Sequence, residues 1–202
     1  MLPPWLGPPD NVLGVSVPLE PLLLLRTEVT AVSLGAFVAY TAGFTFDLAV
    51  RRRVVDDQDV DWFAEQMRFS HRPRRGRELP PEFFRFGIEF ADGRKATNIG
   101  GWVAHRSQAD LPPEGPVLME HGGSGGGTHW DQTYWVWPLP PPGRVTFACE
   151  WPIQHVALTR LDIDAAAIVD ASKRAVTLWD PPAAEGGAPR LRQFSSRREV
   201  ST

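Results

Sequence analysis

A glycine-rich segment flanked by histidines and an aspartate holds the residue types most suited to chemistry in this chain. It runs from Glu120 to Asp131 and has five glycines in the six positions 122–127. Two imidazoles and a carboxylate, from His121, His129 and Asp131, make a ligand set that zinc or iron accepts. If the glycines let the segment fold back on itself, the protein is a small metal-dependent hydrolase with its site here.

Known motifs do not match this segment. A P-loop requires a lysine after its last glycine, but Thr128 follows Gly127. The His-Gly-Gly stretch at 121–123 resembles an esterase oxyanion loop, but the chain lacks the Gly-x-Ser-x-Gly elbow at the required place. Ordering five glycines is entropically expensive, which favours a mobile connection between strands. We therefore expect no cofactor and keep the metal site as the alternative.

An aromatic stretch follows directly. Alternation along residues 133–138 places Tyr134 and Val136 on one face of a strand and Trp135 and Trp137 on the other. A central strand buried on both sides explains two bulky faces. The functional interpretation is an exposed aromatic surface for a sugar, a proline-rich segment or a partner protein. The candidate binding residues are Trp130, Tyr134, Trp135 and Trp137.

The strongest structural signal is strict alternation of apolar and polar residues. It covers residues 44–50, 84–90 and 145–151, and it predicts strands with one buried and one wet face. Asp92-Gly93 supplies the turn of a tight hairpin after the second of these runs. The side chains expected in the core include Phe46, Phe86, Ile88 and Phe147.

Further elements complete the predicted fold. Strands are expected near 26–39, 94–99 and 133–138, giving seven or eight in all, and a helix is expected over 165–179 with Asp164 as its N-cap. The predicted fold is mainly β: an antiparallel β-sandwich, immunoglobulin-like or jelly-roll-like, with one C-terminal helix.

The two ends differ in composition from the middle. Residues 1–21 hold six prolines and predict an arm, either laid on the domain or loose in solvent. The β-sandwich domain with its helix spans 22–179. Residues 180–202 predict a disordered tail, or alternatively an arm that orders on a partner through Leu191 and Phe194.

Composition restricts the function. The net charge of -3 and the sequence pI of about 6.0 argue against nucleic-acid binding through phosphates. The charged segment 56–77, with a helix candidate at 60–67, is interpreted as a solvated loop. Cys149 is the only cysteine, so an intrachain disulfide is impossible. With no signal peptide or membrane span recognised, a cytoplasmic protein is expected.

Two function classes remain. The favoured one is a non-catalytic binding or assembly module that contacts a protein partner or its own copy through the aromatic surface and the terminal arms. The alternative is the metal-dependent hydrolase described above. A flat exposed apolar patch would favour binding, whereas a polar pocket holding the two histidines and the aspartate would favour the enzyme.

Overall fold

The alternating runs form strands whose apolar side chains enter one core. The structure is a computed structural model that describes residues 3–53, 79, 81–99 and 112–179. Phe46, Phe86, Ile88 and Phe147 are all at most 2% exposed, so the prediction that they fill the core is confirmed. The predictions made for 56–77 and for the tail 180–202 lie outside the described residues.

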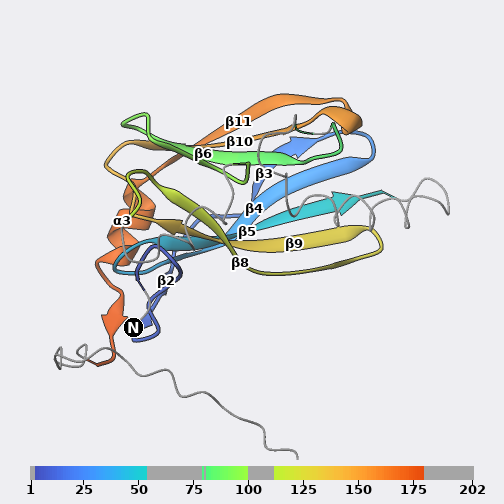
Figure 1. Ribbon diagram of the computed structural model, residues 1–202. Coiled ribbons are helices and arrows are strands. Elements are labelled where there is room, and N and C mark those ends of the chain that lie inside the picture. The colour runs from blue at the N-terminus through green and yellow to red at the C-terminus, as the bar shows by residue number, and fades with distance from the viewer. Residues whose placement is uncertain (1–2, 54–78, 80, 100–111, 180–202) are drawn as a thin grey trace, which may run out of the picture.

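The strands belong to two large antiparallel sheets and a small ribbon (Figure 1). Over the described residues, the larger sheet has the order β2-β4-β5-β9-β8 with β3 also paired to β4, and the smaller sheet has the order β11-β10-β6-β7. The larger sheet contains β2 (Val15–Ser16), β3 (Leu22–Arg26), β4 (Thr30–Ala39), β5 (Phe44–Arg52), β8 (Val117–Gly126) and β9 (His129–Trp137). The smaller sheet contains β6 (Arg85–Phe90), β7 (Lys95–Thr97), β10 (Arg144–Trp151) and β11 (Val156–Asp164), and the ribbon pairs β1 (Val12–Leu13) with β12 (Val176–Thr177).

Aromatic rings join the two large sheets face to face. The rings of Phe46 on β5 and Phe147 on β10 have centroids 5.1 Å apart, and those of Phe86 on β6 and Tyr134 on β9 are 5.5 Å apart. Aromatic pairs at such distances stabilise beyond their buried area. The expected antiparallel β-sandwich is therefore present, with the core between the sheets (Figure 1).

Local turn chemistry sets the hairpins. Between β6 and β7, Gly93 has φ +83° and the amide of Phe90 donates to the carbonyl of Arg94, as the Asp-Gly signal predicts. The strand expected near 26–39 is present as β4, which begins at Thr30 and forms a hairpin with the preceding β3. The Thr27 hydroxyl accepts hydrogen bonds from the amides of Val29 and Thr30, and this side-chain turn reverses the chain.

The helix is shorter than the sequence predicts. The helix α3 covers Ala166–Ser172, and the Asp164 carboxylate accepts a hydrogen bond from the amide of Ala166, although the cap residue itself is Ala165. Beyond α3 the chain enters β12 instead of continuing the helix to 179, because β12 finds hydrogen-bonding partners in β1 near the other end of the chain. A short 3-10 helix, η1 (Pro152–Gln154), lies between β10 and β11.

Residues 3–21 lie on the domain, where two short stretches, β1 and β2, pair with other strands. Over the part of the chain that the structure describes, no helix has the length and apolar content to cross a membrane.

We expect Phe86→Ala to lower the free energy of unfolding by about 3–5 kcal/mol, because it opens a cavity between the sheets. Urea denaturation measures the change. Leu158→Ala is the matched control, since Leu158 is 56% exposed on β11 and should change stability by less than about 0.5 kcal/mol. Equal losses in the two variants would contradict this description of the core.

Candidate functional site

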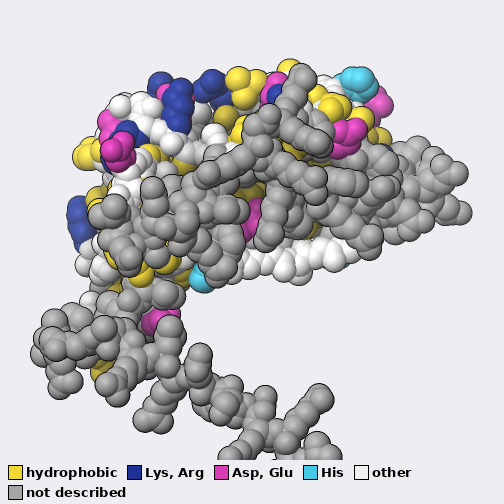
Figure 2. Space-filling model, viewed as in Figure 1, with side chains coloured by type: hydrophobic (Ala, Val, Ile, Leu, Met, Phe, Trp, Pro, Cys, Tyr) yellow, Lys and Arg dark blue, Asp and Glu magenta, His cyan; other side chains and the backbone are white. Residues whose placement is uncertain are grey.

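The glycine-rich segment forms an edge strand, not the mobile connection that the sequence suggested. Gly122–Gly126 belong to β8 and pair with β9 from His129 to Thr133, and the turn between the strands is only Gly127 and Thr128. Gly127 has φ +56°, which its lack of a Cβ allows. At the place of β8 in Figure 1, the space-filling view in Figure 2 shows a white band of backbone and small polar atoms.

The glycines make room for side chains of β9. A Cβ atom at Gly123 would lie 2.7 Å from Oε1 of Gln132 and 2.9 Å from the Asp131 carbonyl oxygen, and one at Gly125 would lie 3.0 Å from the Trp130 ring. The Gln132 amide also donates to the Gly122 carbonyl at 2.5 Å. Gly123 and Gly125 are therefore required because residues of β9 approach them closely. This close packing offsets the conformational entropy that the two glycines lose on folding.

The three candidate metal ligands do not converge. In the register of β8 against β9, His129 pairs with Gly126. His121 lies in a bulge between Glu120, which pairs with Tyr134, and Gly122, which pairs with Thr133. At about 3.3 Å per residue, this separates the two histidines by about 15 Å along the ladder. The Asp131 carboxylate instead pairs with Arg51 at 2.7 Å. Among the described residues, no three His, Cys, Asp or Glu side chains cluster as a metal site requires.

The candidate binding aromatics are largely covered. Trp130 and Tyr134 point into the core between the sheets, and Trp135, on the opposite face of β9, is 0% exposed. Trp137, also on that outer face, is half-buried. The exposed aromatic surface considered from the sequence is therefore not open in the structure, because a second layer lies over Trp135.

That second layer is the N-terminal arm. Trp135, Val117 and Met119 form a buried cluster on the outer face of the larger sheet, which we call the outer cluster, and Trp5 and Leu6 pack against it. The indole Nε1 of Trp135 donates a hydrogen bond of 3.0 Å to the carbonyl oxygen of Pro4. The Trp5 and Trp137 rings meet edge-on, with centroids 5.8 Å apart. The rings thus cover a face that water would otherwise wet.

Tyr134 carries a buried hydroxyl that has no hydrogen-bond partner among the described residues. Burial raises the pKa of Tyr134 well above its usual value, and the negative charge of Glu120 raises it further. The phenol stays neutral at physiological pH and cannot act as a base there. Its ring stacks on Phe46 at 5.6 Å. Tyr134 is therefore a packing residue in this structure.

The sole thiol is similarly inert. Burial raises the pKa of Cys149 to about 12, so its thiolate, the reactive form, is scarce at neutral pH. Cys149 belongs to the core between the sheets.

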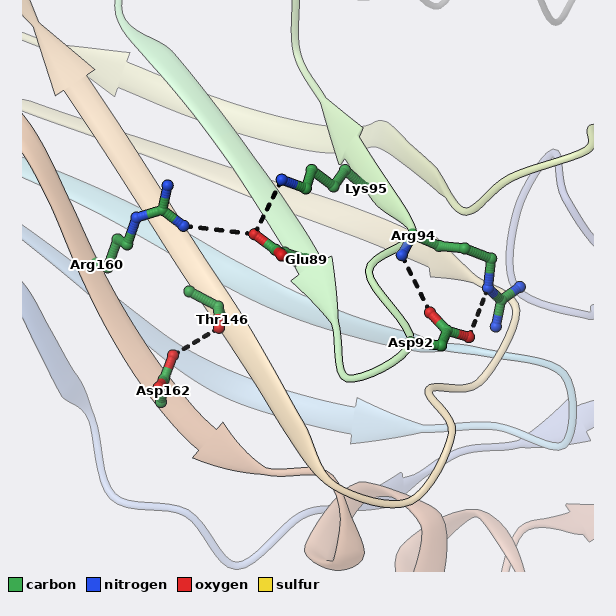
Figure 3. Close-up of polar contacts among 7 residues, drawn as sticks. All are labelled: Glu89, Asp92, Arg94, Lys95, Thr146, Arg160 and Asp162. Atoms are coloured by element: carbon green, nitrogen blue, oxygen red, sulfur yellow. Dashed lines mark hydrogen bonds and ion pairs between the residues drawn. The ribbon is translucent and has the colours of Figure 1, made fainter.

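The outer face of the smaller sheet is polar and balanced in charge. Glu89 lies between Lys95 at 3.3 Å and Arg160 at 3.4 Å, and the Thr146 hydroxyl donates to Asp162 (Figure 3). Farther along this face, Arg85 pairs with Glu150. Partly exposed pairs of this kind contribute about 0–1 kcal/mol each. Opposite charges alternate across the strands, so the described residues of this face present no single-sign field to attract a charged ligand.

The ribbon of β1 and β12 presents an apolar face to solvent. Leu13 and Val176 are opposite each other in the register and are 56% and 54% exposed. The ladder continues to Leu178, whose amide donates to the carbonyl of Asn11. Sequence reasoning missed this surface because its halves lie near opposite ends of the chain, and no local pattern marks them as neighbours.

Comparison with known proteins adds no relative. The chain matches no protein-family model, and neither the curated proteins nor the solved structures contain a match.

Gly123→Ala should lower the free energy of unfolding by about 1–3 kcal/mol, because its Cβ would meet the backbone of Asp131 and the side chain of Gln132. Gly122→Ala is the control one residue away. A Cβ there meets nothing within 4 Å, so stability should change by less than about 0.5 kcal/mol. Urea unfolding measures both, and equal tolerance of the two alanines would restore the mobile-loop interpretation.

Tyr134→Phe should leave stability unchanged or raise it by up to about 1 kcal/mol, because it removes a buried hydroxyl without a partner. Thr146→Val provides the contrast. It removes a buried hydroxyl that donates to Asp162 at 2.6 Å and should cost about 1 kcal/mol. A large loss in Tyr134→Phe, seen in thermal melts, would mean that the phenol oxygen has a partner.

Proposed function

We propose that the protein is a non-catalytic assembly module that contacts a second copy of itself through the apolar face of the ribbon. The observation that carries the proposal is the exposure of Leu13, Val176 and Leu178 together, the last of them 39% exposed. Apolar side chains gathered on one face are typical of a protein contact surface.

The geometry of the ribbon supports a contact role. Residues opposite each other in an antiparallel pair project to the same face, as do residues two positions apart on one strand. Leu13, Val176 and Leu178 therefore share a face, while Val12, on the other side of β1, is buried. An isolated two-stranded ribbon is only marginally stable, and a partner on its outer face would stabilise it.

A second copy fits this surface better than a strongly charged partner. The helix α3, which precedes β12, carries Asp170 and Lys173 as a pair at 2.7 Å, so both signs stand near the ribbon. A symmetric contact between copies needs one self-complementary patch. A few side chains provide less than the roughly 800 Å² per partner of a stable interface, so we expect weak association that depends on concentration.

The hydrolase alternative receives no support from the geometry. It depends on His121, His129 and Asp131 meeting at one point, and the register of β8 and β9 holds them apart.

We also propose that the protein works in a reducing compartment such as the cytoplasm. Its single cysteine, Cys149, is buried and lacks an intrachain partner, so stability relies on the core instead of on disulfides.

Sedimentation velocity between about 10 µM and about 500 µM tests the assembly proposal, because the dimer fraction of a weak dimer rises with concentration. We expect a rising dimer fraction in the parent protein and its loss in Val176→Lys. Leu158→Lys is the control, since Leu158 is equally exposed but lies on β11. A monomer throughout the range, or equal loss of the dimer in both variants, would refute the proposal.

A further inference from the structure

The outer cluster lies on the face of the larger sheet away from the smaller sheet, where the described residues form no further sheet, yet it is sealed from water. Trp135 is 0% exposed there, and Tyr40, which follows β4, packs its ring edge-on against Trp135 with centroids 5.7 Å apart. Trp137 continues the same face of β9. We call Tyr40, Trp135 and Trp137 the aromatic cradle.

The segment seated in this cradle is rich in proline. It reads Pro3-Pro4-Trp5-Leu6, and the amide of Leu6 donates to the carbonyl of Pro3 at 3.0 Å, which closes a turn. The cradle donates a hydrogen bond to the arm, from Trp135 Nε1 to the Pro4 carbonyl. The remaining contact is between rings and apolar side chains.

The cradle contacts this segment through the Pro4 carbonyl and the side chains of Trp5 and Leu6, while Pro4 itself is exposed. A prolyl residue has no amide hydrogen to donate, but its carbonyl is a good acceptor, and its fixed φ reduces the entropy lost on binding. Aromatic grooves use rings for the apolar contact with such a segment. An indole N–H at the floor of the cradle, aimed at a prolyl carbonyl, adds direction to that contact.

Residues 3–6 form a turn outside the strand ladders, whereas the arm farther along pairs through β1 and β2. The indole N–H of Trp5 is buried without a hydrogen-bond partner among the described residues, so the seated segment leaves one polar group unsatisfied. Pro18 and Pro21, farther along the arm, are exposed and add no burial. Its tether also gives the internal segment a high effective concentration.

We propose that the aromatic cradle is a recognition site for a proline-rich segment of a partner protein, and that Pro3–Leu6 occupies it as an internal ligand. The partner segment presents a prolyl carbonyl to Trp135 and a large apolar side chain to Trp137, as Pro4 and Trp5 do here. This surface is separate from the ribbon face, so the inference does not depend on self-association.

The test uses the full-length chain and a fluorescent peptide of residues 3–9, Pro-Pro-Trp-Leu-Gly-Pro-Pro, with fluorescence anisotropy as the readout. Trp5→Ala weakens the internal ligand, so this variant should bind the peptide at least about tenfold more tightly than the parent, whose tethered arm competes. Trp135→Phe, added to Trp5→Ala, keeps a ring but removes the donor and should weaken binding about tenfold. Trp179→Ala, added instead, alters an exposed indole beyond the end of β12 and should leave binding unchanged.

Two further measurements keep the result decisive if Trp135→Phe fails to fold. The peptide should raise the melting temperature of Trp5→Ala, and a peptide with alanine at every proline should not. Absence of peptide binding to folded Trp5→Ala at about 1 mM, the range of tethered concentrations, would overturn the proposal. Equal binding of the alanine peptide would overturn the recognition of proline. If the parent forms a dimer that disappears in Trp5→Ala, the cradle serves arm exchange between two copies, and the proposal of a partner segment is overturned.

Discussion

Phe46 stands at the centre of the sandwich, and its ring contacts rings from both sheets. Phe37 and Tyr134 lie 5.7 and 5.6 Å away within the larger sheet, and Phe86 and Phe147 lie 5.9 and 5.1 Å away in the smaller one. Sheets packed face to face stand about 10 Å apart, a gap that interleaved aromatic rings fill well. Because these rings set the spacing and the alignment of the sheets, every surface feature of the protein is positioned relative to them.

Strand β9 transmits that constraint to the rest of the larger sheet. Its inner face supplies Tyr134 to the core, which forces Trp135 to the opposite face, where the N-terminal arm covers it. The same alternation turns Trp130 and Gln132 inward, and they lean over the backbone of β8. Gly123 and Gly125 of β8 thus follow from the bulk of β9, because they stand where the neighbouring strand has the large side chains of Gln132 and Trp130. An explanation through backbone mobility or metal binding is not needed.

The two terminal segments carry the functional hypotheses, and they do so through different physics. The ribbon leaves apolar side chains in water. Its strands are far apart in the sequence, and the flanking residues Asn11 and Trp179, which are hydrogen-bonded, are 168 positions apart. The arm, in contrast, removes apolar surface from water by covering the cradle. Burying the exposed face of the ribbon against any matching apolar surface lowers the free energy. The cradle, in contrast, binds only a segment that can displace the tethered arm. One chain therefore offers both an open contact surface and an occupied one.

Local patterns in the sequence determine the strands and the core. Period-two alternation places Phe46, Phe86 and Phe147 inside, and Asp92-Gly93 makes its hairpin, because each depends on residues within a few positions. The same patterns mispredict the helix beyond Ser172, since Val176 and Thr177 pair with Val12 and Leu13, which no local signal reveals. They also leave the site undecided. Whether His121 meets His129 depends on the register of β8 against β9, and whether Trp135 meets water depends on where Pro4 and Trp5 settle. Register and the docking of the arm are long-range contacts, whose free energy comes from surface buried between distant segments, and so only the tertiary structure decides them.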